Sequence, residues 1–334
     1  MTRAVTRGLG IPDPALDEEI RGRLDEVEAA LEKAVRADTD SLTAAASYLL
    51  SAGGKRFRPL LVFLGAQFGD PMDPRLVRGA VALELAHVAT LYHDDVMDEA
   101  EFRHGVPSVN VRWGNNLAIL SGDYLFARAS ETAADLGAEV IRLLARTIAT
   151  VCDGQLRDVS MAGSLEQTEA QYMETIRRKT AALIATSCRL GGMLAAASPD
   201  VTDLLERFGA ALGMAFQLSD DIMDITSTQE ELGKPPGQDL RQGIHTLPVL
   251  HALRDGDAGR ELRELLAIGP PHGERLQRAL ELVGREEVLE PARRAVSDEV
   301  GRGIRLANGL PAGPAREAFV HLAAYLATRC GAKT

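Results

Sequence analysis

Apolar residues recur at steps of three and four along most of the chain, which is the period of a helix that buries one face. The pattern begins between Leu16 and Ala37, where acidic residues crowd the start of the stretch, as a helix dipole favours. Asp40 or Ser41 can cap a second helix that ends near Ala52. Further long helices are predicted over residues 75–101, 115–136, 138–161, 166–196 and 200–227, and shorter ones follow.

Glycine and proline clusters punctuate these stretches, as at Gly69-Asp70-Pro71 and Gly105-Val106-Pro107. The sequence shows no alternating strand pattern of useful length and no linker between two halves. We therefore predict an all-α fold, with a flexible N-terminal tail over 1–15 and a single large helical domain over 16–334. Pro12 and Pro14 argue against a helix within the tail.

The composition supports the all-α prediction and excludes some classes of function. Of the 334 residues, 46% are hydrophobic and only 4% aromatic, which favours helices rich in Ala and Leu over a β-sandwich. The net charge of −11 disfavours nucleic acid as the main partner, although a local basic cluster for a phosphorylated ligand remains compatible with it.

Three sparse cysteines without a CxxC pair indicate neither a disulfide framework nor a zinc site, which fits a cytoplasmic protein. No apolar run approaches the roughly 18 residues of a membrane span. The first residues have no apolar segment of the kind that a signal peptide needs, so we expect no stable membrane insertion.

One four-residue spacing of aspartates occurs twice, in Asp94-Asp95-Val96-Met97-Asp98 and in Asp220-Asp221-Ile222-Met223-Asp224. Positions i and i+4 of a helix face the same way, so each segment directs two carboxylates to one point with a third beside them. A solvated acidic face would explain one such segment, but two in apolar surroundings favour cation binding. Carboxylate oxygens suit Mg²⁺, which completes its coordination with water and substrate phosphates.

Cations suited to phosphate lie on the turn Gly53-Gly54-Lys55-Arg56-Phe57-Arg58-Pro59. Lysine offers a point charge and arginine a planar fork for phosphate oxygens. The spacing is not that of a Walker A loop, and a basic helix start in water is the alternative. Other candidates are Arg103, His104, Lys179, Lys234, Arg241 and His87.

With these motifs in view, the sequence resembles the trans-type isoprenyl diphosphate synthases, or polyprenyl synthetases, from about residue 45 to 251. The resemblance rests on GGKRFRP, ELAHVATLYHDDVMDEAEFRHG, GDYLFARA, Lys179-Thr180, FQLSDDIMDI and GKPPGQDLRQGIHTLP. It implies an all-helical fold around a deep central cavity, a homodimer, and addition of isopentenyl diphosphate to an allylic diphosphate. It also implies Mg²⁺ as cofactor, with three ions when substrate is bound.

The resemblance carries roles over to individual positions. The metal would be bound by Asp94, Asp98, Asp220 and Asp224. Asp95 and Asp221 would support these ligands directly or through water. Arg103, Lys179 and Lys234 would hold the allylic diphosphate; Lys55, Arg58 and His87 would hold isopentenyl diphosphate. Thr180 and Gln217 would turn dipoles toward the carbocation, and Phe216 would pack near the homoallylic substrate.

Two positions depart from the family pattern. His104 stands where the family commonly has a second Arg that would contact isopentenyl diphosphate, and Ile244 stands where it often has Lys. His245 or Arg241 could replace the missing cation. Both changes are expected to weaken binding more than to abolish chemistry.

Product length is expected to depend on the inward face of the helix that carries Asp94. Short-chain members of the family typically have an aromatic residue five positions before the first aspartate, where this chain has Ala89. Neither Ala89 nor Thr90 can close a tunnel, and Ala86 and Ala82 continue the same face. We therefore predict long-chain products; the alternative is that these alanines only allow close helix packing.

Three other functions are compatible with parts of the sequence. A class I terpene cyclase has one DDxxD segment but normally pairs it with an Asn/Ser/Glu motif. A non-catalytic subunit of a heteromeric prenyl synthase would have eroded aspartates. A His-Asp phosphohydrolase would rest on the dipeptide His93-Asp94 alone.

Overall fold

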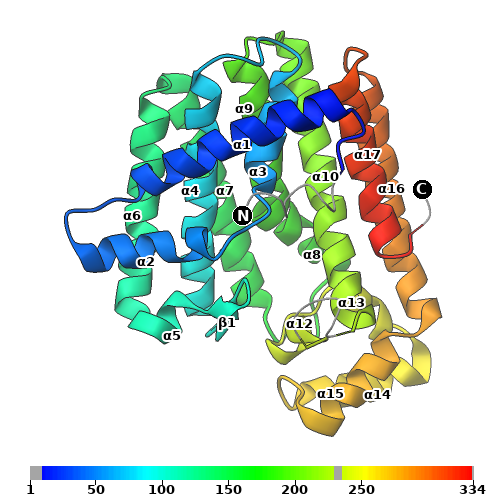
Figure 1. Ribbon diagram of the computed structural model, residues 1–334. Coiled ribbons are helices and arrows are strands. Elements are labelled where there is room, and N and C mark those ends of the chain that lie inside the picture. Colours follow the sequence, from blue (N-terminus) through cyan, green and yellow to red (C-terminus); the bar gives the residue numbers. More distant parts are fainter. Residues whose placement is uncertain (1–9, 229–234, 333–334) are drawn as a thin grey trace. The chain divides into compact units, whose positions relative to one another are not determined.

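Helices make up nearly all of the regular structure in residues 10–228 and 235–332, the residues that the computed structural model describes (Figure 1). The first six are α1 (Pro14–Ala34), α2 (Asp40–Ser51), α3 (Phe57–Ala66), α4 (Arg75–Met97), α5 (Val109–Trp113) and α6 (Asn115–Ala134). Next come α7 (Ala138–Met161), α8 (Glu169–Ile176), the π-helical turn η2 (Arg177–Ala181), α9 (Ala182–Leu194) and α10 (Pro199–Thr226). The last are α12 (Gln238–Arg241), α13 (Leu247–Ala252), α14 (Gly256–Ala267), α15 (Gly273–Val283), α16 (Glu286–Asn308) and α17 (Pro314–Arg329). The predicted all-α class is confirmed.

The N-terminal prolines start a helix instead of excluding one. Asp13 caps α1 by accepting a hydrogen bond from the Leu16 amide at 2.8 Å, and Pro14 occupies the first turn, where a proline costs no hydrogen bond. The predicted tail over 1–15 therefore overlaps α1, and residues 1–9 lie outside the described residues.

A two-stranded hairpin follows α4, where the sequence predicted no strand and a helix continuing to 101. Strand β1 (Phe102–Arg103) pairs antiparallel with β2 (Val106–Pro107). The two turn residues, His104 and Gly105, have φ angles of 51° and 77°. Positive φ at both positions is what a type I′ hairpin turn requires, so the Arg-His-Gly string encodes a turn that strand periodicity cannot show.

The chain divides into two compact units. Unit 1 takes residues up to Ile148 together with Leu183–Gly209 and Leu306–His321, and unit 2 takes Ala149–Ala182, Ala210–Arg305 and residues from Leu322 on. Helices α7, α10, α16 and α17 each contribute residues to both units. The single domain over 16–334 stays a prediction.

In unit 1, α4 is the central helix and packs against α6, α3 and α1. It is apolar on most sides, as a helix covered by several neighbours must be. Figure 1 shows α1 crossing α3 and α4. Tyr92 of α4 is fully buried and its hydroxyl donates to the Ala45 carbonyl at 2.6 Å, which ties α4 to α2.

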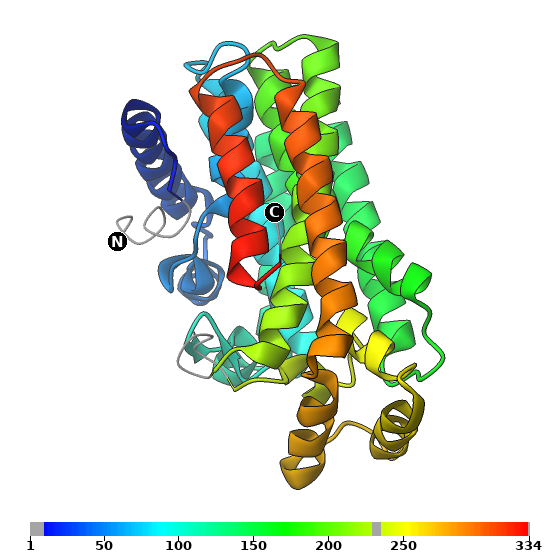
Figure 2. The ribbon, with the colours of Figure 1, turned by 90° about the vertical axis from the view of Figure 1, so that its right-hand side faces the viewer.

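In unit 2, the short helices α13, α14 and α15 pack around their own apolar cluster, which includes Leu240, Val249, Leu262, Leu276 and Leu282. Figure 2 shows α14 and α15 as a pair of neighbouring helices. In both, apolar residues occupy one face and charged residues the other.

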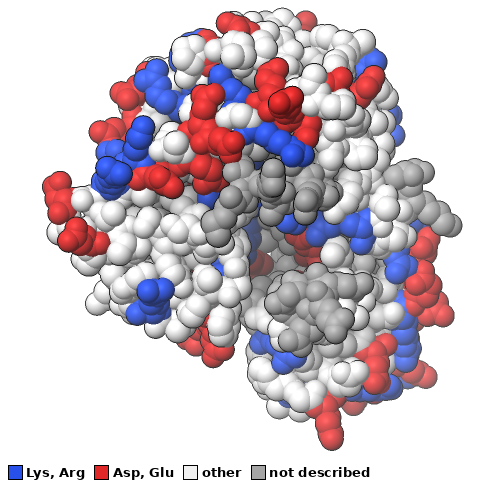
Figure 3. All heavy atoms as spheres, in the orientation of Figure 1, with Lys and Arg blue, Asp and Glu red and all other residues white. Residues whose placement is uncertain are grey.

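Within the described ranges, no helix combines the length and the apolar character needed to cross a bilayer. Figure 3 shows acidic and basic side chains interspersed along α1 on the face that it displays. This mixture differs from the single-sign basic stripe that a polyanion-binding surface presents.

Candidate active site

The first aspartate segment lies in unit 1, in the last turn of α4. Asp94 and Asp98 are half-buried, and the Asp98 amide donates to the Asp94 carbonyl at 2.8 Å, so helical spacing holds to the end of the segment. Asp95 is fully buried and accepts from Arg103 Nε at 2.8 Å. Burial raises the pKa of Asp95, and the Arg103 guanidinium opposes that rise. Asp95 therefore holds Arg103 in place, and Arg103 comes from the hairpin that follows.

The three cations of the GGKRFRP turn have different environments. Arg56 is buried, with a left-handed φ of 42°, and donates to both carboxylate oxygens of Glu28, at 2.6 and 3.1 Å. It also donates to Glu84 at 3.2 Å and to the Leu50 carbonyl at 2.9 Å. Arg56 thus fixes the turn and is not available to phosphate. Lys55 is exposed.

Arg58 and His87 lie in one polar cluster inside unit 1. Burial lowers the pKa of Arg58 to about 10, and the charge of Glu84 partly offsets the effect. Burial also lowers the pKa of His87 well below its usual value, and Arg58, His104 and Arg103 act in the same direction. His87 is therefore a neutral donor or acceptor surrounded by cations, a suitable arrangement for an anionic phosphate.

His104 lies at the exposed edge of this cluster. Partial burial of its ring lowers the pKa of His104, the charges of Arg103 and Arg56 lower it further, and a backbone hydrogen bond at Gly53 opposes them. At neutral pH the side chain carries no charge, unlike the Arg that commonly occupies this position in the family that the sequence resembles.

The second aspartate segment lies in unit 2, on α10. Asp220 is half-exposed and pairs with Arg329 of α17 at 2.7 Å. The same guanidinium lies over the Phe216 ring, with 5.6 Å to its centroid, and its Nε lies 3.1 Å from the Met223 sulfur. Sequence reasoning missed Arg329, because no motif marks a single cation near the end of the last helix.

Asp224 is buried and its carboxylate accepts from the Asp239 amide at 3.1 Å. Its backbone carbonyl accepts from the Gly237 amide at 2.7 Å. Asp224 therefore anchors the segment that begins α12. Lys234, the predicted allylic-phosphate cation, lies outside the described residues.

Lys179 and Thr180 lie in η2, where the predicted continuous helix over 166–196 widens by one turn of π-helix. Two glycines allow neighbouring helices to approach this turn. A Cβ at Gly154 of α7 would lie 2.4 Å from the Lys179 nitrogen, and one at Gly213 of α10 would lie 2.5 Å from the Ala181 Cα. The Lys179 ammonium pairs with Asp158 of α7.

Four side chains of unit 2 form a continuous chain of hydrogen bonds. Thr180 Oγ1 donates to Gln217 Oε1 at 2.8 Å, and Gln217 Nε2 donates to Asp221 Oδ1 at 2.9 Å. The Tyr172 hydroxyl donates to the other oxygen of Asp221. The structure thus brings Thr180 and Gln217 together with Asp221, which the resemblance had assigned to the metal, and adds Tyr172, which the sequence did not single out.

His245 does not supply the cation that Ile244 lacks. It is buried, its Nδ1 lies 2.9 Å from the Ser164 carbonyl, and burial lowers its pKa. The expectation that His245 could replace a lysine is therefore wrong. Arg241 of α12 is half-buried.

The donor chemistry of the aspartates fits Mg²⁺. In residues 10–228 and 235–332, no three His, Cys, Asp or Glu side chains are grouped closely enough to hold a metal ion by themselves. In proteins, one or two carboxylates typically bind Mg²⁺, and water and substrate phosphates complete its coordination. His93 lies 3.3 Å from Asp123 and 3.2 Å from the Ile119 carbonyl, which does not make the ligand set of a phosphohydrolase.

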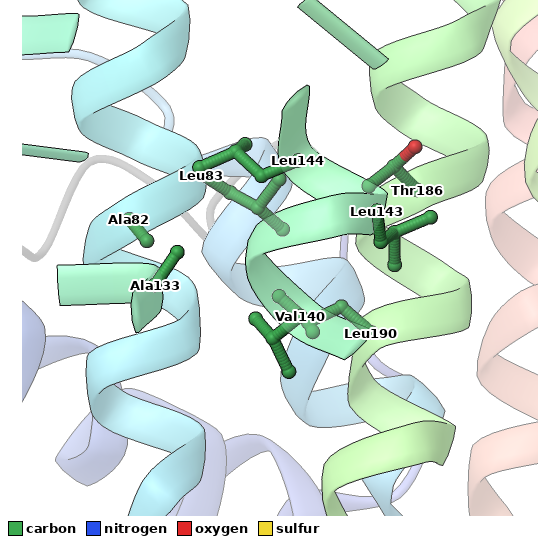
Figure 4. A pocket seen from close by; sticks show the side chains of 8 residues that line it. All are labelled: Ala82, Leu83, Ala133, Val140, Leu143, Leu144, Thr186 and Leu190. Atoms are coloured by element: carbon green, nitrogen blue, oxygen red, sulfur yellow. The ribbon is translucent and has the colours of Figure 1, made fainter. Parts of the chain in front are cut away.

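The inward face of α4 leads to a narrow apolar pocket within unit 1. Ala82, Ala86 and Ala89 are almost fully buried, and Thr90 donates to the His87 carbonyl at 2.6 Å. The pocket begins at Ala82, about 18 Å along the helix from Asp94 by the rise per residue. Figure 4 shows its lining: Ala82, Leu83, Ala133, Val140, Leu143, Leu144, Thr186 and Leu190.

Comparison with known proteins agrees with this arrangement. A sequence model of the polyprenyl synthetase family matches residues 39–283. The nonaprenyl diphosphate synthase of Mycobacterium tuberculosis is 39% identical over 329 residues, 98% of each chain. Component 2 of the heptaprenyl diphosphate synthase of Geobacillus stearothermophilus is 42% identical over 306 residues, covering 91% of this chain and 94% of that one.

A solved structure shows the same fold. The polyprenyl synthase of Caulobacter crescentus CB15, complexed with calcium and isoprenyl diphosphate, superposes with a TM-score of 0.89 at 30% identity, over 94% of this chain and 96% of that one. The fold is thus the all-α isoprenoid synthase fold. This chain belongs to the polyprenyl synthetase family and is a prenyltransferase.

Proposed function

We propose that the chain is a Mg²⁺-dependent polyprenyl diphosphate synthase. It joins isopentenyl diphosphate head-to-tail, in trans, to an allylic diphosphate, releases diphosphate and repeats the step to make a long-chain product. The observation that carries this proposal is that each unit pairs an aspartate segment with cations suited to diphosphate. In unit 1 these are Lys55, Arg58 and Arg103, and in unit 2 Lys179.

Each group of residues has a distinct part in the reaction. Lys179 and Arg103 hold the allylic diphosphate while its C–O bond breaks and the bonding electrons leave with diphosphate. The Thr180 hydroxyl and Gln217 amide turn dipoles toward the allylic cation. Lys55, Arg58 and His87 hold isopentenyl diphosphate so that its alkene attacks that cation. The departing diphosphate is a plausible acceptor for the proton that is lost last.

Asp94, Asp98 and Asp220 would bind Mg²⁺, with Asp224 nearby on α10. A metal ion held there would neutralise charge on the leaving diphosphate. Asp94 and Asp98 lie on the same side of the helix, because helical spacing extends to Asp98. The Caulobacter crescentus structure is complexed with calcium, which supports the use of a divalent cation.

The length of the product follows from α4. Ala89, Ala86 and Ala82 place small, buried side chains along α4 on the way from Asp94 to the pocket that Ala82 lines, and this is the face that the growing chain would follow. Leu143 and Leu144 lie across that pocket and are candidates for its floor (Figure 4). The names of the nonaprenyl and heptaprenyl relatives support a long product.

We further propose a cytoplasmic homodimer. Ile119 and Leu120 of α6 are exposed by 41% and 59%, which is unusual for two adjacent large apolar residues on a helix. The Geobacillus stearothermophilus relative is named as one component of a synthase, so a different partner is the competing possibility. The molar mass of the purified protein in solution, measured alone by light scattering, decides whether it assembles with itself.

The enzymatic proposal is tested by incubating purified protein with labelled isopentenyl diphosphate, allylic diphosphates and Mg²⁺. We predict that Asp94→Ala and Asp220→Ala each lower turnover by orders of magnitude without unfolding the protein, since each relieves like-charge repulsion on its helix. EDTA should abolish the activity of the wild type, and added Mg²⁺ should restore it.

Near-normal condensation by either variant, or full activity in EDTA, would contradict the metal assignment. Cyclic hydrocarbon formed from the allylic substrate alone would indicate a terpene cyclase. A wild type that folds but converts nothing by itself would indicate a non-catalytic subunit.

A further inference from the structure

Tyr172 is a buried polar residue to which the proposed reaction assigns no task. It lies on α8, is 4% exposed, and points its hydroxyl at Asp221 of α10, which is 2% exposed. A capping box fixes the start of α8: Thr168 accepts from the Gln171 amide at 3.2 Å, and Gln171 accepts from the Thr168 amide at 2.8 Å. The tyrosine therefore projects from a well-defined helix.

Asp221 uses both of its oxygens on protein donors. One accepts from Tyr172 and the other from Gln217 Nε2. A phenol hydroxyl keeps its proton at neutral pH, so Tyr172 donates to the buried Asp221 carboxylate.

The contact with Asp221 gives the Gln217 amide a single orientation. Its NH₂ group donates to Asp221 and its oxygen accepts from the Thr180 hydroxyl. Rotation of the amide by half a turn would set its oxygen against a carboxylate oxygen of Asp221, so that the hydrogen bond to Asp221 is lost and two acceptors face each other. Losing a hydrogen bond to a buried carboxylate is costly, even though the rotated NH₂ could still donate to the Thr180 hydroxyl. The hydrogen bond to the Gln217 oxygen holds the Thr180 hydroxyl in η2.

We propose that Tyr172 and Asp221 are positioning residues for the prenyl transfer: together they fix the Gln217 amide and the Thr180 hydroxyl in the orientation that stabilises the allylic cation. This inference rests on the proposed function. It gives Asp221 a task different from the support of metal that the family resemblance implied. Dipoles that already point in the right direction before the cation forms do not have to reorient during the reaction. They therefore stabilise the cation without an added cost in free energy of activation.

The test is Tyr172→Phe, which removes one oxygen and leaves the ring in place. We expect kcat to fall about tenfold, less than the loss for removing a group that itself touches a reacting centre. The KM values for both diphosphates should change by less than about twofold, because the phosphate-holding cations are untouched. A role in stability alone would lower the melting temperature and leave kcat per folded molecule unchanged.

A double-mutant cycle makes the assignment sharper. If Tyr172 acts only through Gln217, then adding Tyr172→Phe to a Gln217→Met protein should cause no further loss of kcat. Tyr92→Phe is the matched control, since it removes an equally buried hydroxyl from the other unit, and its effect should add to that of Gln217→Met.

Asp221→Asn provides a second route if Tyr172→Phe fails to fold. An asparagine carries no charge and turns one of the two acceptors of Asp221 into a donor, so one of the two hydrogen bonds must reverse or be lost, and kcat should fall, again without additivity to Gln217→Met. Full additivity of either variant with Gln217→Met, or an unchanged kcat, would overturn the inference while leaving the proposed function intact. A wild type without condensing activity would overturn both.

Discussion

At the scale of single residues, the structure separates cations that look alike in the sequence. Lys55, Arg56 and Arg58 stand within four positions, yet Arg56 is bound by Glu28 and Glu84 while Lys55 is exposed. The carboxylates that bind Arg56 come from α1 and α4. The sequence near the turn therefore could not show that the Arg56 guanidinium is already paired. The basic turn itself was predicted because its chemistry is local.

His104→Arg should tighten isopentenyl diphosphate binding, because a permanent cation replaces a neutral ring. Charge-assisted hydrogen bonds contribute about 1.5–3 kcal/mol, which corresponds to a KM roughly ten- to hundredfold lower. His104→Asn is the control, since Asn also tolerates the left-handed backbone but adds no charge. An unchanged KM in His104→Arg would show that the side chain does not face the phosphate.

The pH dependence of this effect follows from the lowered pKa of His104. Above that pKa the wild type is neutral, so the advantage of arginine should be constant from pH 7 to 9 (an interval chosen from the usual His value of about 6.5). As the pH falls through the lowered pKa, the histidine gains charge and the advantage should shrink. KM profiles of both proteins check this.

Arg329→Gln should lower the Mg²⁺ concentration needed for half-maximal activity, because Arg329 and a divalent ion compete for Asp220. A partly exposed ion pair contributes about 0.2–1 kcal/mol, so a shift of about 1.4- to fivefold is expected. Arg329→Lys keeps the positive charge, so it should change the Mg²⁺ concentration for half-maximal activity by a smaller factor. A higher Mg²⁺ requirement in Arg329→Gln would instead indicate that Arg329 helps to hold diphosphate.

At the scale of elements, periodicity predicted most helices but not their irregular turns. Helix α7 has the predicted bounds, and α10 differs by one residue at each end. The π-turn η2 and the hairpin after α4 were missed. The spacing of apolar residues hardly changes when one turn of a helix widens, so it does not reveal a π-helical turn. A strand of two residues is too short to show an alternation of apolar and polar residues. Both irregular elements carry predicted site residues, Lys179 with Thr180 and Arg103.

Gly154→Ala should destabilise the protein by about 1–3 kcal/mol, because its Cβ would meet the η2 backbone. Turnover should fall as well, since Lys179 and Thr180 must shift. Gly22→Ala is the control: it lies inside α1 with no atom within 4 Å of the added Cβ, and should stabilise by up to about 1 kcal/mol. Denaturant unfolding of both variants tests this, and equal stabilities would contradict the close packing.

Ala89→Phe should shorten the products with little loss of the first condensation, if the growing chain follows the alanine face of α4. Ala80→Phe is the control, because nine residues place it on the opposite face of the same helix, where it is equally buried. Chromatography of the labelled products gives the lengths. Unaltered lengths in a folded Ala89→Phe protein would show that Ala89 serves packing alone.

At the scale of the whole molecule, the sequence predicted the class of fold and the two aspartate segments, because each depends on local spacing. It did not predict which charges are already paired. Arg329 with Asp220 and Tyr172 with Asp221 join positions 109 and 49 residues apart. These pairs form because residues of α17 and α8 lie beside α10 in the folded chain. The periodicity of a single helix does not show which other helix it will contact.

The division of the chain between the units has a consequence for its synthesis. Unit 1 needs Leu306–His321 in addition to the residues up to Ile148, and unit 2 needs residues from Leu322 on. Neither unit is complete until residues beyond Leu306 have left the ribosome. At about 5–20 residues per second, the apolar faces of the early helices stay uncovered for many seconds. The nascent chain should therefore be a client of holding chaperones, and a stop codon before α17 should yield aggregate instead of a working half-enzyme.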